Sequence, residues 1–177
     1  VRPHIKAMVQ SIDRSVGRIV ATLKRLNLDR RTLVIFTSDN GGYLTYGTNF
    51  RQISSNGPWR AQKGSVYEGG HRVPAVFHWP SKIAAAVTDQ TAISIDLLPT
   101  IAAIAAADTG GLALDGVDLA PLLFRGKPLP GRTLFWRKGT QKAVRRGPWK
   151  LAVEQPSRVE LYNLDHDMGE RNNVAKE

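Results

Sequence analysis

Two side chains with metal-binding oxygens, Asp39 and Asn40, directly follow a short apolar segment. This segment, Thr32–Thr37, is apolar and β-branched, which predicts a strand buried on both faces of a parallel sheet. In open α/β sheets, ligands bind at the carboxyl ends of such strands. Because a carboxylate beside an amide oxygen suits a hard cation, the pair predicts a Ca²⁺ or Mg²⁺ site. The alternative is a polar turn, since Gly41 and Gly42 come next.

A second polar block, between residues 60 and 74, carries groups that could act on an anion. Lys63 lies in a polar, glycine-bearing segment, where it is either an anion-binding residue or an ordinary surface charge. Glu68 and Arg72 fit a structural ion pair better than a catalytic pair. His71, between them, has suitable acid and base chemistry, and we expect it at the surface or behind the site.

Together the two blocks resemble the type I sulfatases of the alkaline-phosphatase-like superfamily. The resemblance rests on Thr-Leu-Val-Ile-Phe-Thr-Ser-Asp-Asn-Gly-Gly at residues 32–42, Lys63-Gly64, Glu68-Gly-Gly70 and Arg72-Val-Pro74. It extends through nearly the whole chain. It implies that Asp39 and Asn40 bind Ca²⁺ or Mg²⁺ and that Lys63 is a catalytic residue that contacts the sulfate. One departure, His166-Asp-Met-Gly-Glu170 in place of Asp-Pro and a glutamate, is expected in a surface turn.

Sulfate-ester hydrolysis also needs a nucleophile, and the sequence lacks the family's motif for it. In the family, the nucleophile is a formylglycine made from the first residue of Cys/Ser-x-Pro-x-Arg. Glu154-Gln-Pro-Ser-Arg158 approaches that pattern, but a glutamate cannot become an aldehyde. The family's paired aspartates are also absent, and His4 is the candidate for the leaving-group acid. We therefore expect a C-terminal portion of a sulfatase, inactive alone, whose missing N-terminal half holds the formylglycine.

The composition is that of a globular chain with an excess of basic residues. The 177 residues are 42% hydrophobic, and 25 Lys and Arg against 15 Asp and Glu give a formal net charge of +10. The absence of cysteine excludes disulfides, thiolate metal sites and a cysteine nucleophile. No apolar run approaches the ~20 residues of a membrane span. The resemblance implies a periplasmic, secreted or lysosomal protein.

The elements that position these groups follow from periodicity and turn residues. Apolar side chains at steps of three and four predict an amphipathic helix from Pro3 to Leu26, ended by Asn27-Leu-Asp29. Ala75–Trp79 predicts a second buried strand, and Thr91–Ala107 predicts a helix. After Pro130, alternating runs predict a small antiparallel sheet. The predicted fold is α/β, with residues 1–126 as the C-terminal part of a sulfatase parallel sheet with flanking helices and residues 131–177 as an antiparallel subdomain.

Two other functions fit parts of the sequence. A phosphatase or phosphonate hydrolase of the same superfamily would use the same metal and lysine on another tetrahedral dianion. A non-catalytic module could hold polyanions on the nine basic side chains between Arg125 and Lys150, although such a stretch is also typical of a solvated face. As a sulfatase, the protein would act on a sulfate-ester small molecule or a sulfated saccharide, and no specific nucleic acid is expected as a partner.

Overall fold

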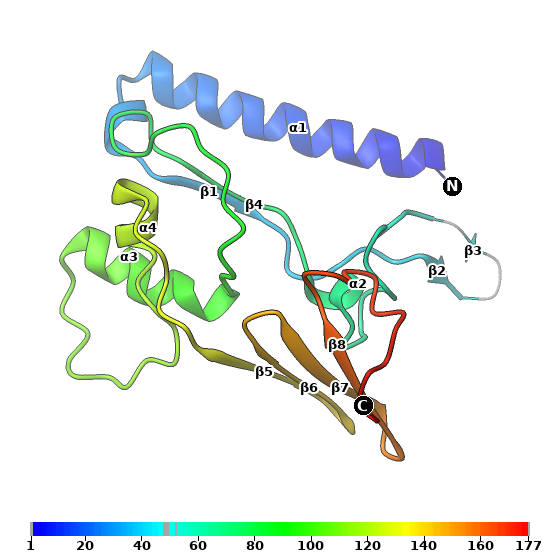
Figure 1. Ribbon diagram of the computed structural model, residues 1–177. Coiled ribbons are helices and arrows are strands. Elements are labelled where there is room, and N and C mark those ends of the chain that lie inside the picture. The colour runs from blue at the N-terminus through cyan, green and yellow to red at the C-terminus, as the bar shows by residue number, and fades with distance from the viewer. Residues whose placement is uncertain (1, 48–49, 52, 177) are drawn as a thin grey trace. The chain divides into compact units, whose positions relative to one another are not determined.

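The computed structural model describes residues 2–47, 50–51 and 53–176 (Figure 1). The helices are α1 (Arg2–Arg25), α2 (Glu68–His71), α3 (Leu97–Ala105) and α4 (Ala120–Arg125), with 3-10 turns at Asp29–Arg31 and Ser94–Asp96. The strands are β1 (Val34–Thr37), β2 (Thr45–Tyr46), β3 (Phe50–Arg51), β4 (Ala75–His78), β5 (Thr133–Lys138), β6 (Gln141–Arg146), β7 (Trp149–Gln155) and β8 (Arg158–Asn163). The described strands pair in the orders β1-β4, β2-β3 and β5-β6-β7-β8. These elements confirm the predicted α/β class and the antiparallel C-terminal sheet.

The chain divides into two compact units. One comprises residues 1–21, 36–76 and 131–177, and the other comprises residues 22–35 and 77–130. A boundary between them falls at residues 130–131. The first unit contains every candidate site residue together with the C-terminal sheet, so the candidate site lies within this unit.

The long helix α1 confirms the amphipathic helix predicted at the start of the chain. It ends where the sequence indicates, because Asn27 adopts a left-handed φ of +57° and Leu28 N donates to Leu23 O at 2.9 Å. Several apolar side chains of α1 remain exposed, among them Met8 (61%) and Ile19 (55%). Neither α1 nor any other helix of the described residues is long and apolar enough to span a bilayer.

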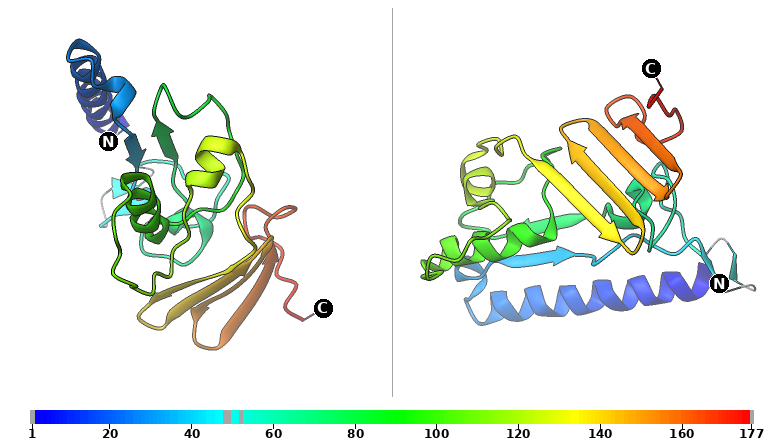
Figure 2. Two further views of the ribbon diagram at one scale, coloured as in Figure 1. Left: turned by 90° about the vertical axis from the view of Figure 1, so that its left-hand side faces the viewer. Right: turned by 90° about the horizontal axis from the view of Figure 1, so that it is seen from below.

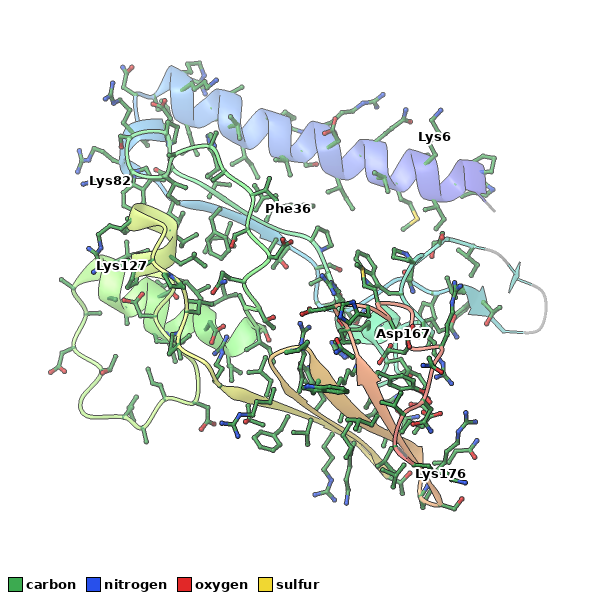
Figure 3. The ribbon with its side chains drawn as sticks, viewed as in Figure 1. Lys6, Phe36, Lys82, Lys127, Asp167 and Lys176 are labelled. Atoms are coloured by element: carbon green, nitrogen blue, oxygen red, sulfur yellow. The ribbon has the colours of Figure 1, made fainter. Side chains whose placement is uncertain are left out.

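The strands β1 and β4 are paired, but they are not buried on both faces as predicted. Phe36 in β1 is 41% exposed (Figure 3), and most of β4 is exposed as well. Thr37 Oγ1 donates to Pro74 O, and Gly41 N donates to Gly70 O, so these contacts run in opposite directions along the two segments, as in an antiparallel pair. The parallel neighbours that would bury both faces of β1 are not among the described residues.

The helix predicted for Thr91–Ala107 is shorter in the structure, where α3 begins at Leu97 after a 3-10 turn. The Asp96 carboxylate explains the late start, because it accepts hydrogen bonds from Ile93 N at 2.8 Å and Val117 N at 2.9 Å. These bonds satisfy two main-chain N–H groups in residues that are not helical. The contacts between the buried Asp96 carboxylate and these N–H groups therefore override the helical pattern of the residues before Leu97.

The four-stranded sheet, β5 to β8, has one inward and one outward face (Figure 2). The strand register places two adjacent rows on the inward face: Leu134, Arg145, Lys150 and Tyr162, then Trp136, Ala143, Ala152 and Glu160. Ala152 and Tyr162 of this face pack with Tyr67 and Leu164 in a buried cluster. By contrast, Phe135 on the outward face is 69% exposed. The segment before α2 therefore rests on the inward face of the sheet.

Strand alternation splits the basic stretch that the sequence suggested as a polyanion-binding face. Arg145 and Lys150 turn inward, and their side chains are 16% and 0% exposed. Arg137, Lys142 and Arg146 are exposed. The nine basic residues therefore do not form one continuous exposed face.

Candidate metal and sulfate site

Asp39 and Asn40 lie in the loop that directly follows β1. Asp39 is exposed, and within the described residues its carboxylate has no hydrogen-bond or ion-pair partner. Asn40 is half-buried, and its Nδ2 donates to Gly41 O at 3.1 Å. This bond uses the amide nitrogen and leaves the side-chain oxygen Oδ1 out of the contact. The Asp39 carboxylate and the Asn40 amide oxygen are therefore suitable as two ligands of a hard cation. No cluster of three or more His, Cys, Asp or Glu that could hold a metal occurs in the described part of the chain.

The side chain of Asn56 joins this loop to residues 60–70. It accepts a hydrogen bond from Gly42 N at 3.1 Å and donates to Gly42 O at 2.8 Å. It also donates to Ala61 O and Gly69 O, each at 3.1 Å. One amide thus pairs with four main-chain groups. Asn56 is not predicted from the sequence, because an asparagine in a Gly- and Ser-rich loop belongs to no periodic pattern.

The two loops meet where a side chain has no room. Gly41 N donates to Gly70 O at 3.0 Å, and Gly69 N donates to Arg60 O at 2.7 Å. An added Cβ would lie 1.9 Å from Gly69 O at position 41, 2.4 Å from Arg60 O at position 69 and 2.1 Å from Ser65 O at position 70. These distances show that the backbone approaches so closely at Gly41, Gly69 and Gly70 that only glycine fits.

Lys63 is brought to the same loop by its main chain. Its N donates to Gly42 O at 3.2 Å, although 24 positions separate Lys63 from Asp39 in the sequence. The side chain is exposed, and Nζ lies 5.5 Å from the centroid of the Tyr43 ring. No carboxylate of the described residues lies within ion-pair distance of this ammonium. Lys63 is therefore available to an anion.

The predicted ion pair between Glu68 and Arg72 is present, with 3.3 Å between Glu68 Oε2 and Arg72 Nη1. Glu68 is buried, however, and its carboxylate also lies 2.9 Å from Lys150 Nζ and 3.6 Å from Arg145 Nη1. Burial by itself raises the pKa of Glu68, but the charge and hydrogen bond of Lys150, with a smaller effect of the Arg145 charge, outweigh it and hold the pKa below its ordinary value. Glu68 is thus the centre of a buried charge cluster.

Glu170 completes this cluster from the C-terminal tail. Its Oε1 lies 2.9 Å from Lys150 Nζ, and its Oε2 accepts a hydrogen bond from Glu68 N at 2.7 Å. Burial raises the pKa of Glu170 even though Lys150 opposes the shift. Asp167 holds the tail turn (Figure 3), since its carbonyl accepts from Glu170 N at 3.1 Å. The prediction that residues 166–170 form a mere surface turn is wrong for Glu170, which is fully buried.

His71 lies against the charge cluster. Its ring stacks on Trp136 with 4.6 Å between centroids, and its Nε2 lies 3.2 Å from both Lys150 Nζ and Val66 O. Burial and the charge of Lys150 lower the pKa of His71 to about 4, so the imidazole is neutral at neutral pH. No hydrogen bond or ion pair of the described residues joins His71 to Asp39 or Lys63.

We expect this lowered pKa to make the protein less stable in acid. Unfolded His71 takes up a proton near pH 6.5, whereas the folded protein does so only near pH 4. The free energy of unfolding is therefore unaffected by protonation of His71 above pH 6.5. It decreases as the pH falls from 6.5 towards 4, by up to about 3 kcal/mol. Urea unfolding at pH 7 and at pH 4.5 measures the loss. The non-titrating variant His71→Gln should lose less stability between these two pH values, and an equal loss would contradict the assignment.

His4 lies in the first turn of α1 and is exposed. No hydrogen bond or ion pair joins it to another described residue. Its suggested role as the leaving-group acid stays a prediction.

Comparisons with known proteins identify the family that this chain matches. Residues 3–107 match the family model described as Sulfatase. Human arylsulfatase A is 40% identical over 137 residues, which cover 77% of this chain and 26% of that protein. Mouse N-acetylgalactosamine-6-sulfatase is 37% identical over 144 residues, which cover 80% of this chain and 27% of that protein. The chain therefore spans about a quarter of the length of these curated relatives.

A solved structure shows the same likeness in three dimensions. The crystal structure of Ps i-CgsB in complex with k-i-k-neocarrahexaose is 32% identical and superposes with a TM-score of 0.85. The match covers 99% of this chain and 39% of that one. The fold of this chain is thus similar to part of a larger protein.

Proposed function

This chain belongs to the sulfatase family, and from that premise we propose that it supplies Asp39, Asn40 and Lys63 to the active site of a sulfuric-ester hydrolase. The observation that carries the proposal is the hydrogen bond from Lys63 N to Gly42 O. It ties the lysine to the loop that carries Asp39 and Asn40. An anion held by the lysine and a metal held by the loop could then share one substrate.

In this proposal, Asp39 and Asn40 hold a Ca²⁺ or Mg²⁺ ion through their side-chain oxygens. When bound, the ion supplies positive charge to the oxygens of the sulfate group. The loop keeps Asn40 oriented, because Ser38 Oγ donates to Asn40 O at 3.0 Å and Asn40 Nδ2 is bound to Gly41 O. These local bonds hold the ligand before the ion arrives.

Lys63 contributes a second positive charge on the same substrate. Its ammonium can neutralise a sulfate oxygen and stabilise the charge that develops on the leaving oxygen. The nucleophile, which we propose is a formylglycine, and the remaining metal ligands would come from residues outside this sequence. The substrate class is a sulfate ester, either a small molecule or a sulfated saccharide, in a periplasmic, secreted or lysosomal setting.

The test is hydrolysis of an aryl sulfate by the full-length protein that contains this chain. We expect activity that a chelator removes and added Ca²⁺ or Mg²⁺ restores. Asp39→Ala should raise the cation concentration needed for half-maximal activity at least about 10-fold, because a charged ligand is lost. Asp13→Ala, which removes an exposed carboxylate of α1, serves as the matched control. Faster hydrolysis of an aryl phosphate than of the sulfate would instead favour the phosphatase function.

A further inference from the structure

Lys150 of β7 is a fully buried lysine that the proposed chemistry does not use. Its Nζ lies 2.9 Å from Glu68 Oε1, 2.9 Å from Glu170 Oε1 and 3.2 Å from His71 Nε2. The ammonium donates a hydrogen bond to Glu68 Oε1, whereas its contact with Glu170 Oε1 is an ion pair without a hydrogen bond. Lys150 therefore contacts α2 and the C-terminal tail at once.

The residue held by Lys150 is continuous with the main chain that supports the metal loop. Glu68 is followed by Gly69, whose carbonyl accepts from the Asn56 side chain, and by Gly70, whose carbonyl accepts from Gly41 N. Gly41 adjoins the proposed ligand Asn40. Glu68, the partner of Lys150, is thus connected to the proposed metal site through two peptide units and one hydrogen bond.

Both the side chain and the main chain of Glu68 depend on this cluster. Lys150 pairs with the carboxylate of Glu68, while Glu170, paired with the same ammonium, accepts the hydrogen bond from Glu68 N at 2.7 Å. Buried ion pairs contribute little net stability, because removing the charges from water offsets their attraction. Their geometry nevertheless restricts where the partners can lie.

We propose that Lys150 is a positioning residue, whose buried ammonium holds the Glu68–Gly70 segment in the place that orients the Asp39–Gly42 loop and Lys63. Its effect on turnover rests on the proposed function, whereas its effect on the loops does not. A lysine in the small C-terminal sheet would thus control the geometry of a site built on residues 39–63.

The double variant Lys150→Met, Glu170→Gln tests this in the full-length protein. It removes one positive and one negative charge, so Glu68 keeps Arg72 and Arg145 as partners. The side-chain oxygen of glutamine at position 170 can still accept a hydrogen bond from Glu68 N. Methionine at position 150 fills most of the volume of the aliphatic part of the lysine side chain. Glu170→Gln alone and Lys142→Met, at an exposed position of β6, are the controls.

We expect the double variant to melt within a few degrees of the parent but to exchange the amide hydrogens of Gly41 and Lys63 at least about 10-fold faster. Its kcat for an aryl sulfate should fall roughly 10- to 100-fold, since small displacements of reacting groups have effects of that size. KM should change less than kcat. Exchange and kcat equal to those of the two controls would overturn the proposal.

Two further outcomes remain decisive. Should the double variant not fold, Glu68→Gln weakens the same contact while leaving Lys150 paired with Glu170, and unchanged exchange at Gly41 would then overturn the proposal. Should the parent protein hydrolyse no sulfate ester, the proposed function is lost, but the exchange rates still decide the role of Lys150.

Discussion

Lys63→Ala is expected to lower kcat for an aryl sulfate by roughly 10²–10³-fold in the full-length protein, the loss typical of one preorganised electrostatic contact. The reason is that no carboxylate of the described residues neutralises the Lys63 ammonium, so its charge is available to the substrate. Because the side chain is exposed, the variant should keep the melting temperature of the parent. Steady-state kinetics and a thermal melt measure the two quantities.

The matched control for Lys63 is Lys82→Ala, which removes another exposed lysine (Figure 3). We expect this control to retain the parent kcat. Lys63→Arg should recover part of the activity, because it keeps the charge but changes the shape of the donor group. Normal turnover by Lys63→Ala would show that Lys63 is an ordinary surface residue.

Gly41→Ala is expected to destabilise the fold by about 3 kcal/mol or more, near the upper end of what overpacking costs. A Cβ at this position would lie 1.9 Å from the carbonyl oxygen of Gly69, which is main chain and cannot rotate aside. Relief would require the Asp39–Gly42 loop to separate from residues 60–70. The hydrogen bond from Gly41 N to Gly70 O would then be lost as well.

Urea unfolding of the purified protein measures this effect against Gly17→Ala. Gly17 lies in α1 with no atom within 4 Å of an added Cβ, so alanine there should raise stability by up to about 1 kcal/mol. The two variants add the same methyl group with opposite expected signs. A Gly41→Ala protein as stable as the parent would contradict the close packing of the two loops.

The features that depend on neighbouring residues can be predicted from the amino-acid sequence. The apolar period and Asn27 predicted α1 and its end, and alternating runs predicted β5 to β8. The strand followed by Asp39 and Asn40 was likewise predicted by a local pattern. Local backbone preferences and side-chain spacing act over a few residues, so a single sequence displays them directly.

Which side chains are buried and which loops meet depends on packing between segments that are distant in sequence. Alternation gives a strand two faces, but packing against the segment before α2 selects the face that buries Lys150. Asn56 acquires its role through contacts with residues 42, 61 and 69, which no local pattern indicates. Phe36 stays exposed although its strand is apolar, because β4 is its one paired neighbour among the described strands. Burial is a property of surfaces that are distant in sequence, and it therefore emerges only when they pack.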